Sequence, residues 1–123
     1  MSETVEITVI EGIQTLRLTR SEKRNALTQD MYRELSDALE AGEADDTIRV
    51  RVIFGSAGHF SGGSDIADFL VTAKGEQDFL NEVLRFIEIL PRIKKPLIAG
   101  VDGQAIGIGT TLLLHCDLVY ATP

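Results

Sequence analysis

LIAGVDGQAIGIGTTLLLHCD, the stretch from Leu97 to Asp117, decides the fold of this chain. Its apolar run Leu97 to Val101 predicts a buried strand, three glycines in the next eight residues predict a tight loop, and Thr110 to Leu114 can continue as a helix. Glycine lets the backbone adopt positive φ and approach another group closely. Because the free N–H groups at a helix start also favour negative charge, the stretch is a candidate anion site.

The same pattern occurs once earlier in the chain. Arg49 to Phe54 reads RVRVIF and predicts a strand, and GSAGHFSGGSDIADFL follows it with four glycines within nine residues. Ser64 and Asp65 are placed to cap a short helix through Leu70. Ligands of α/β sheets collect where strands end, so we expect the two glycine loops to face one pocket.

The remaining segments alternate between strand and helix patterns. Val5 to Ile10 and Ile13 to Leu18 alternate with period two around a glycine turn and predict a hairpin. Thr28 is the expected cap of an amphipathic helix that Gly42 ends. A polar hinge over Thr72 to Gln77 precedes a second amphipathic helix that Pro91 stops, with five apolar residues on one face: Phe79, Val83, Phe86, Ile87 and Leu90. Asp117 to Ala121 predicts a last strand, and the whole indicates an α/β fold.

Other interpretations of the Leu97 stretch are weaker. A dinucleotide-binding fingerprint needs a third glycine where Leu112 stands, and no lysine follows any of the glycines as a phosphate-binding loop requires. A membrane span would carry Asp102 and Gln104 near its middle. A buried strand and helix joined by a turn without any chemistry stays open for this stretch taken alone.

Composition limits the class of protein. The 123 residues are 44% hydrophobic and 25% charged, which fits one globular domain or part of one. The net charge of -7 argues against nucleic acid or an anionic membrane surface as the main partner. Because the N-terminus lacks a positively charged, apolar leader, we expect a cytoplasmic protein.

The few cysteines and histidines do not suggest a metal site. One cysteine excludes an internal disulfide, and two histidines with one thiol do not make a tetrahedral site, so we expect no metal. His115 and Cys116 follow three leucines, which favours packing at a helix end over catalysis. His59 stands in a polar loop and is expected to be an ordinary exposed histidine.

Three pieces of the chain, EKRNAL, HFSGGSDIADF and KKPLIAGVDGQAIGIGTTLLLHCDLVYA, resemble the crotonase superfamily of enoyl-CoA hydratases and isomerases. The resemblance runs from the first hairpin to the last residue. It implies a spiral of ββα units, incomplete here because family members are considerably longer, so that residues 1–123 form the N-terminal portion of one crotonase-like domain. It also implies acyl-CoA thioester substrates, no cofactor beyond the coenzyme A of the substrate, and a homotrimer or hexamer.

The same resemblance implies a set of site residues. Two backbone N–H groups, one from each glycine loop, hold the thioester oxygen in this family, and by position in the motifs they fall on Ser64 and Ile108. The residues implied to contact the substrate are Lys23, Arg24, Ala26, Gly62, Gly63, Ser64, Asp65, Ile66, Ala67, Gly107 and Ile108. Two alternatives stay open: Lys23 and Arg24 are solvated loop charges, and Ser64 to Ala67 form a plain helix cap.

One position departs from the hydratase pattern. Hydratases of the family carry a catalytic glutamate where this chain has Thr111, and a threonine hydroxyl is no general base near neutral pH. The wording GIGTTLLL is closest to Δ3,Δ2-enoyl-CoA isomerases, which move a proton with one carboxylate from a later segment. We therefore expect an isomerase, with a 2-enoyl-CoA hydratase as the alternative.

The implied base is not in this sequence. The family's later segment would lie beyond Pro123, and the only acids near the two loops are Asp65 and Asp102, of which Asp65 is expected to cap a helix. A second class of function therefore stays open, namely a non-catalytic chain that binds coenzyme A or an inactive fragment whose apolar faces are uncovered.

Overall fold

The computed structural model describes residues 3–71 and 76–123. Its strands are β1 (Val5–Ile10), β2 (Ile13–Leu18), β3 (Val50–Phe54), β4 (His59–Ser61), β5 (Leu97–Val101), β6 (Gln104–Ala105) and β7 (Leu118–Ala121). Its helices are α1 (Gln29–Ala44), α2 (Ile66–Val71), α3 (Glu76–Ile89) and α4 (Ile108–Thr111), with 3₁₀ turns at Ser21–Lys23, Leu90–Arg92 and Leu112–His115. No helix among these described residues is long and apolar enough to cross a membrane.

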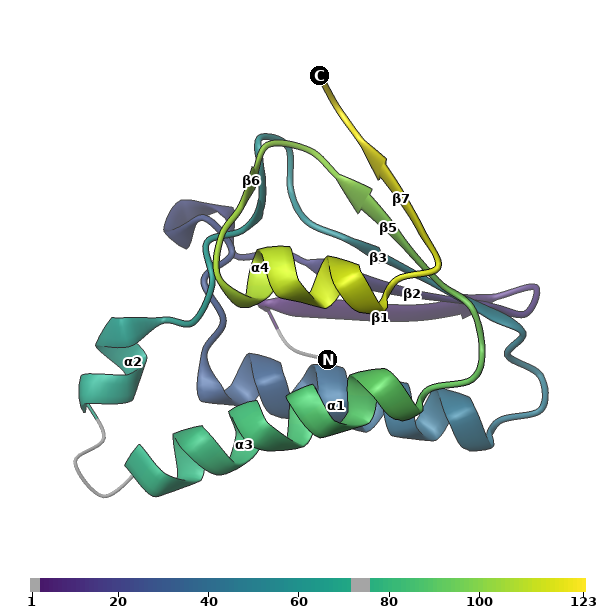
Figure 1. The fold of residues 1–123 in the computed structure, drawn as a ribbon, viewed down its shortest axis with the longest axis horizontal. Coiled ribbons are helices and arrows are strands. Elements are labelled where there is room, and N and C mark those ends of the chain that lie inside the picture. The colour runs from purple at the N-terminus through teal and green to yellow at the C-terminus, as the bar shows by residue number, and fades with distance from the viewer. Residues whose placement is uncertain (1–2, 72–75) are drawn as a thin grey trace.

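Most strands belong to one five-stranded sheet with the order β1-β2-β3-β5-β7. Strands β1 and β2 form the predicted antiparallel hairpin, and the other neighbours in this sheet are parallel. Strands β4 and β6 pair separately, also in parallel (Figure 1). The chain thus passes twice from the large sheet to the small one and on to a helix: first through β3, β4 and α2, and then through β5, β6 and α4. This repeat confirms the expected crotonase-like arrangement of ββα units.

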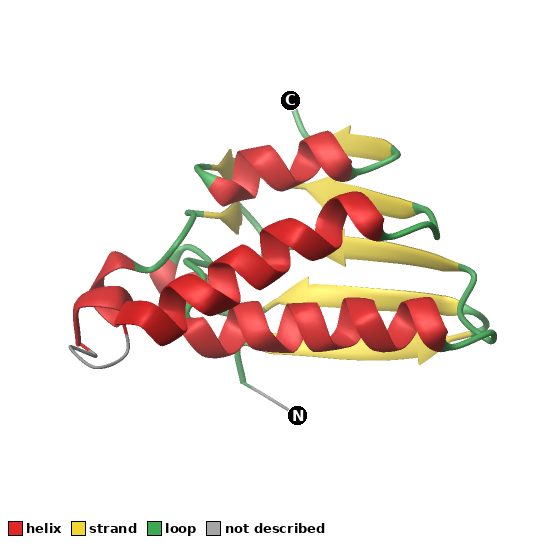
Figure 2. Cartoon of the chain, turned by 60° about the horizontal axis from the view of Figure 1, so that its bottom comes forward, coloured by secondary structure: helices red, strands yellow, loops and turns green. Residues whose placement is uncertain are grey.

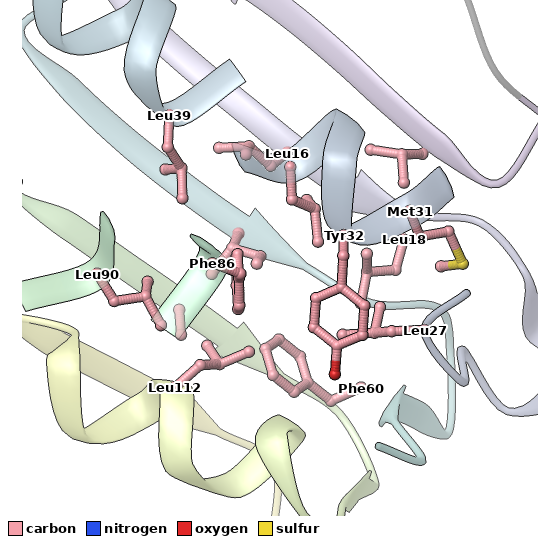
Figure 3. Close-up of a cluster of buried hydrophobic side chains, with 14 of the residues drawn as sticks. Leu16, Leu18, Leu27, Met31, Tyr32, Leu39, Phe60, Phe86, Leu90 and Leu112 are labelled. Atoms are coloured by element: carbon pink, nitrogen blue, oxygen red, sulfur yellow. The ribbon is translucent and has the colours of Figure 1, made fainter. Parts of the chain in front are cut away.

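The helices α1, α3 and α4 lie on one face of the large sheet (Figure 2). Alternation along β2 directs Leu16 and Leu18 toward these helices, and the apolar side of α1 meets them with Met31 and Leu35. The buried cluster extends to Leu112 beside α4 (Figure 3). Because β3 and β5 are parallel and share this buried cluster, the glycine loops that follow them lie at the same end of the sheet.

Gly42 does not end α1, which continues to Ala44. A Cβ at Gly42 would lie 2.6 Å from Oε1 of Gln14, whose side chain fills the space beside the helix. Packing therefore explains this glycine better than helix termination does. Thr28 caps the other end as predicted, since its Oγ1 accepts a hydrogen bond from Met31 N at 3.2 Å.

The second amphipathic helix also differs from its prediction. Phe79 and Phe86 are buried, but Ile87 is 43% exposed and was wrongly placed on the buried face. Its neighbours one and two turns earlier, Leu84 and Leu80, are exposed as well. The predicted hinge over 72–77 lies outside the described residues at 72–75, and its last two residues begin α3.

The helix predicted from Thr110 begins two residues earlier. Helix α4 starts at Ile108, directly after the glycine loop, and a 3₁₀ turn continues it to His115. Gly109 lies inside this helix. Glycine suits this position because a Cβ would come within 2.7 Å of the Ser61 carbonyl oxygen. The first turn of α4 therefore packs directly on β4.

Candidate functional site

The two glycine loops lie in direct contact, as the pairing of β4 with β6 requires. A Cβ at Gly103 would sit 1.9 Å from the carbonyl oxygen of Gly58, so only glycine fits where the loops cross. The N–H of Gly58 donates to Oδ2 of Asp102 at 3.0 Å and fastens the loops a second time. Sequence alone gave no sign of the short strands β4 and β6 that bring the loops together.

Ser64 and Ile108, the two residues implied to donate N–H groups, follow glycines that touch. A Cβ at Gly63 would lie 3.8 Å from the Cα of Gly107, so the two donors come from adjacent pieces of backbone. Within residues 3–71 and 76–123, neither the Ser64 N–H nor the Ile108 N–H has a hydrogen-bond acceptor. Backbone N–H groups without acceptors, on two adjacent pieces of backbone, are suitable donors for an oxygen that carries negative charge.

The backbone on either side of the Ser64 N–H is fixed. Leu27 N donates to Gly63 O at 2.7 Å, and Asp65 N donates to Leu27 O at 2.8 Å. The N–H of Gly63 donates to the Ser61 hydroxyl at 3.1 Å. Rigid donors of this kind lose little energy in reorganisation when charge develops nearby.

The loop with Lys23, Arg24 and Ala26 lies against the first glycine loop. Its centre is Asn25, which is fully buried at φ 55° and whose Nδ2 donates to the His59 and Phe60 carbonyl oxygens at 2.8 and 3.2 Å. Gly62 N donates to Arg24 O at 2.8 Å. The side chains of Lys23 and Arg24 are exposed, while the buried side chain of Asn25 holds the loop in place.

A hollow of about 280 Å³ lies between this loop and the start of α2. It is lined by Arg20, Lys23, Asp65, Ala67 and Asp68. The structure thus brings together three of the predicted residues, Lys23, Asp65 and Ala67, whereas Ile66 is 64% exposed beside them. Arg20 was missed because a basic residue in a polar loop looks the same in sequence whether it is paired or free.

Asp65 is engaged in structural contacts. Its Oδ2 pairs with Arg20 Nη1 at 2.5 Å, and its Oδ1 accepts the Asp68 N–H at 3.0 Å, which caps α2. Burial opposes ionisation, but the Asp68 N–H and the Arg20 guanidinium outweigh it and hold the pKa of Asp65 below its ordinary value. An acid held in this way is a poor proton acceptor, so Asp65 acts as a cap.

We predict that Asp65→Asn lowers the free energy of unfolding by about 2 kcal/mol at pH 7, because it leaves a mostly buried guanidinium without its counter-charge. A depressed pKa stabilises the fold above the ordinary value of about 4 and loses that effect as pH falls through the folded value. Urea unfolding should therefore show the gap between the two proteins closing toward pH 3. Asp30→Asn, at an exposed ion pair with Arg33, is the control and should cost under about 1 kcal/mol. A gap for Asp65→Asn that is constant with pH would contradict this assignment.

Thr111, at the place of the hydratase glutamate, is exposed in the last turn of α4. Its N–H donates to Gly107 O at 3.0 Å. Asp102, the other acid near the loops, is occupied by Gly58 N and by the hydroxyl of Thr122 at 3.0 Å each. The loops thus offer hydrogen-bond donors but no free carboxylate beside them among the described residues.

A larger hollow of about 410 Å³ lies at the ends of β2, β3, β5 and β7. It is lined by Arg17, Phe54, Gly55, Ser56, Ala57, Gly100, Val101, Asp102, Tyr120, Ala121 and Thr122. The guanidinium of Arg17 lies 4.7 Å from the centre of the Phe54 ring. Ser64 and Ile108 line neither of these two hollows, whereas edge residues of both loops line the larger one.

The remaining candidate groups are two histidines and one cysteine, of which His115 is exposed at the end of its 3₁₀ turn rather than packed. Cys116 is half buried against the core, and burial, with a smaller effect of Asp117, raises the pKa of its thiol to about 11. His59 is half buried in β4 rather than exposed, because β4 turns its loop inward against Asn25. Among the residues that the structure describes, no cluster of three or more histidine, cysteine or acidic side chains could hold a metal ion.

Comparisons with known proteins agree with this arrangement. The sequence model of the family described as Enoyl-CoA hydratase/isomerase matches residues 8–123. The human protein Enoyl-CoA delta isomerase 2 is 38% identical over 98% of this chain and 32% of its own length. The 1,2-epoxyphenylacetyl-CoA isomerase of Escherichia coli K12 is 35% identical over 98% of this chain and 48% of its own.

Solved structures show the same fold. Pseudomonas aeruginosa OdaA superposes with a TM-score of 0.87 at 46% identity, over 98% of this chain and 48% of that one. An enoyl-CoA hydratase/isomerase from Pseudoalteromonas atlantica T6c superposes with a TM-score of 0.86 at 33% identity, over 96% of this chain and 46% of that one. The chain therefore spans 32% to 48% of the length of these relatives.

Proposed function

The chain belongs to the enoyl-CoA hydratase/isomerase family, and from that membership we propose that it binds an acyl-CoA thioester and stabilises the enolate form of that thioester. One observation carries the proposal. The N–H groups of Ser64 and Ile108, on two loops in contact, have no acceptor within the described residues. A thioester oxygen that gains charge as the α-proton leaves is the acceptor that these donors fit. Each such donor contributes roughly 3 kcal/mol in measured oxyanion holes.

We assign the coenzyme A portion to the surface beside the first glycine loop. The exposed cations of Lys23 and Arg24 suit phosphate, and the hollow between Lys23 and Ala67 is lined by Asp65, the residue after Ser64. The residues in this assignment, with the oxygen-binding pair, are Lys23, Arg24, Ala26, Gly62, Gly63, Ser64, Asp65, Ile66, Ala67, Gly107 and Ile108. Asp65 contributes by capping α2 and holding Arg20 rather than by touching a proton. Coenzyme A enters as part of the substrate, and no separate cofactor takes part.

The reaction that we favour is Δ3,Δ2-enoyl-CoA isomerisation. A base removes a proton from the carbon beside the thioester carbonyl, the electron pair forms a dienolate, and the proton returns to the far carbon as the double bond shifts. Thr111 cannot be this base, and Asp65 and Asp102 are already engaged. We therefore assign the base to a carboxylate outside residues 1–123.

Two alternatives remain distinct from isomerisation. A 2-enoyl-CoA hydratase would need an acid or base at Thr111, where this chain has neither. A non-catalytic chain that binds coenzyme A, or an inactive fragment, would bind the ligand without turnover. Hydration of a 2-enoyl-CoA by the unaltered protein would favour the first alternative over isomerisation.

We extend the proposal to assembly, for which the family resemblance implies a homotrimer or hexamer, and we propose the cytoplasm as the location. For assembly, the support in this chain is the exposed apolar stripe of α3, formed by Leu80, Leu84 and Ile87. Apolar residues that share one helix side and remain exposed are typical of surfaces covered by another segment or subunit. Sedimentation of the assembled protein tests this point.

Ile108→Pro tests the proposed function, because proline at the first position of α4 removes the N–H and keeps a helix start. Acetoacetyl-CoA is a suitable probe, since its enolate absorbs in the near ultraviolet. We expect the unaltered chain to raise that absorbance and Ile108→Pro to reduce the enolate equilibrium about 100-fold, the scale of one lost oxyanion donor.

Ile108→Ala is the matched control, since it trims the side chain but keeps the N–H. It should retain most of the enolate signal. Equal loss in both variants, or no enolate with the unaltered chain, would contradict the proposed role of Ile108. Turnover of a 3-enoyl-CoA by residues 1–123 alone would show instead that the base lies within them.

A further inference from the structure

Tyr32 reaches the candidate site from inside the core. It lies on α1 with no exposed surface, and its hydroxyl is 2.6 Å from Oγ of Ser64. Phe79 and Phe86 of α3 meet its ring edge-on, with ring centres 5.9 and 5.6 Å away. Figure 3 shows the ring projecting from α1 into the cluster, with the hydroxyl at its far end.

The Tyr32 hydroxyl is satisfied by its hydrogen bond with Ser64. A buried tyrosine hydroxyl needs a hydrogen-bond partner, and Ser64 supplies one. Burial raises the pKa of Tyr32 above its ordinary value against the smaller opposing effect of Ser64, so the hydroxyl is protonated at neutral pH. Because aromatic packing fixes the ring, the position of the hydroxyl is fixed as well, and its hydrogen bond restrains the Ser64 side chain.

Ser64 is thereby held at its side chain and through the residues before and after it. Leu27 bonds to the backbone of Gly63 and of Asp65, the residues before and after it. Tyr32 holds its side chain. The N–H that remains without an acceptor is the group assigned above to the thioester oxygen.

We propose that Tyr32 is a positioning residue whose hydroxyl fixes Ser64 so that the Ser64 N–H meets the thioester oxygen. This inference rests on the proposed function, which supplies the thioester oxygen as the ligand of the Ser64 N–H. The role of Tyr32 in positioning rests on its contact with Ser64. It connects the packing of α1 against α3 to the stabilisation of an enolate. Coenzyme A binding, which uses the outer side of the loop, should depend little on Tyr32.

Tyr32→Phe in the full chain tests the inference, with Tyr120→Phe as the matched control because Tyr120 is the other tyrosine and is 65% exposed on β7. The first measurement is the chemical shift and hydrogen exchange of the Ser64 amide without ligand. We expect both to change in Tyr32→Phe and to stay constant in Tyr120→Phe. An unchanged Ser64 amide in Tyr32→Phe overturns the inference, whatever the ligand measurements give.

The second measurement separates positioning from a general loosening of the fold. With acetoacetyl-CoA, Tyr32→Phe should reduce the enolate equilibrium roughly fivefold to tenfold, the scale of one lost hydrogen bond, while the Kd for coenzyme A stays constant. Ser64→Ala, which removes the same contact from the other side, should match it, and the double variant should lose no more than either alone. Additive losses, or equal weakening of coenzyme A binding, would overturn the inference. No enolate with the unaltered chain would overturn the proposed function, and the amide measurement would still decide the role of Tyr32.

Discussion

Gly103→Ala is expected to separate the two glycine loops and to abolish the enolate signal with acetoacetyl-CoA. The new Cβ would lie 1.9 Å from the carbonyl oxygen of Gly58, a backbone atom that cannot move without disturbing β4. At φ 81° alanine is also strained by about 1 to 2 kcal/mol. We expect the free energy of unfolding to fall by about 3 kcal/mol or more, the strain and the overpacking together.

Gly58→Ala provides a matched control for Gly103→Ala. Gly58 has the same φ of 81°, but a Cβ there would meet no atom within 4 Å. Both variants carry the same backbone strain, so the difference between them measures the loop contact alone. We expect Gly58→Ala to cost only about 1 kcal/mol and to keep the enolate signal. Similar losses in the two variants would contradict the steric explanation.

Glu43→Gln is expected to destabilise the fold by about 3 kcal/mol, because it leaves Arg51 as an uncompensated buried cation. The Arg51 side chain has no exposed surface, and its Nη2 pairs with Oε1 of Glu43, which is 27% exposed. Nε and Nη1 of Arg51 have no partner among the described residues. Glu43 also accepts the N–H groups of Lys94 and Lys95 at 3.2 Å and so fastens α1 to the segment that precedes β5.

Arg51→Met separates the cost of a buried charge from the value of the contact. It removes the cation and keeps an apolar chain of similar length, so we expect a change under about 1 kcal/mol, since Glu43 can remain solvated. The double variant with Glu43→Gln should regain most of the stability lost in Glu43→Gln alone. Urea unfolding of the three variants measures this cycle, and equal losses in both single variants would argue against it.

The stabilisation of the fold by Glu43 is expected to weaken in acid. Burial opposes ionisation of Glu43, but the Lys95 and Lys94 N–H groups and the Arg51 charge outweigh it and hold the pKa of Glu43 below its ordinary value. The stabilisation is therefore complete above the ordinary pKa of about 4.3 and is lost as pH falls through the folded value. The difference between the unaltered protein and Glu43→Gln should shrink accordingly in acid.

Several parts of the fold could be predicted from the sequence because they depend on neighbours along the chain. Period two gave the hairpin of β1 and β2, and apolar spacing with the Thr28 cap gave α1. The clustered glycines gave both loops, and their motifs in order gave the family. These features follow from backbone sterics and from side-chain period, which a sequence displays directly.

The tertiary structure alone decided which of these segments meet. Gly42 was predicted at a helix end, Ile87 in the core and His59 in solvent. In the structure Gln14 fills the space beside Gly42, Ile87 lies on the exposed side of α3, and Asn25 bonds to the backbone of His59. Tyr32 with Ser64, and Arg20 with Asp65, join residues 32 and 45 positions apart. Local sequence patterns cannot predict such pairs, because each pair forms only when the folded ββα units bring distant segments within hydrogen-bond distance. The sequence determined the elements and the family, and the closure of the chain determined the contacts that hold the two N–H groups together.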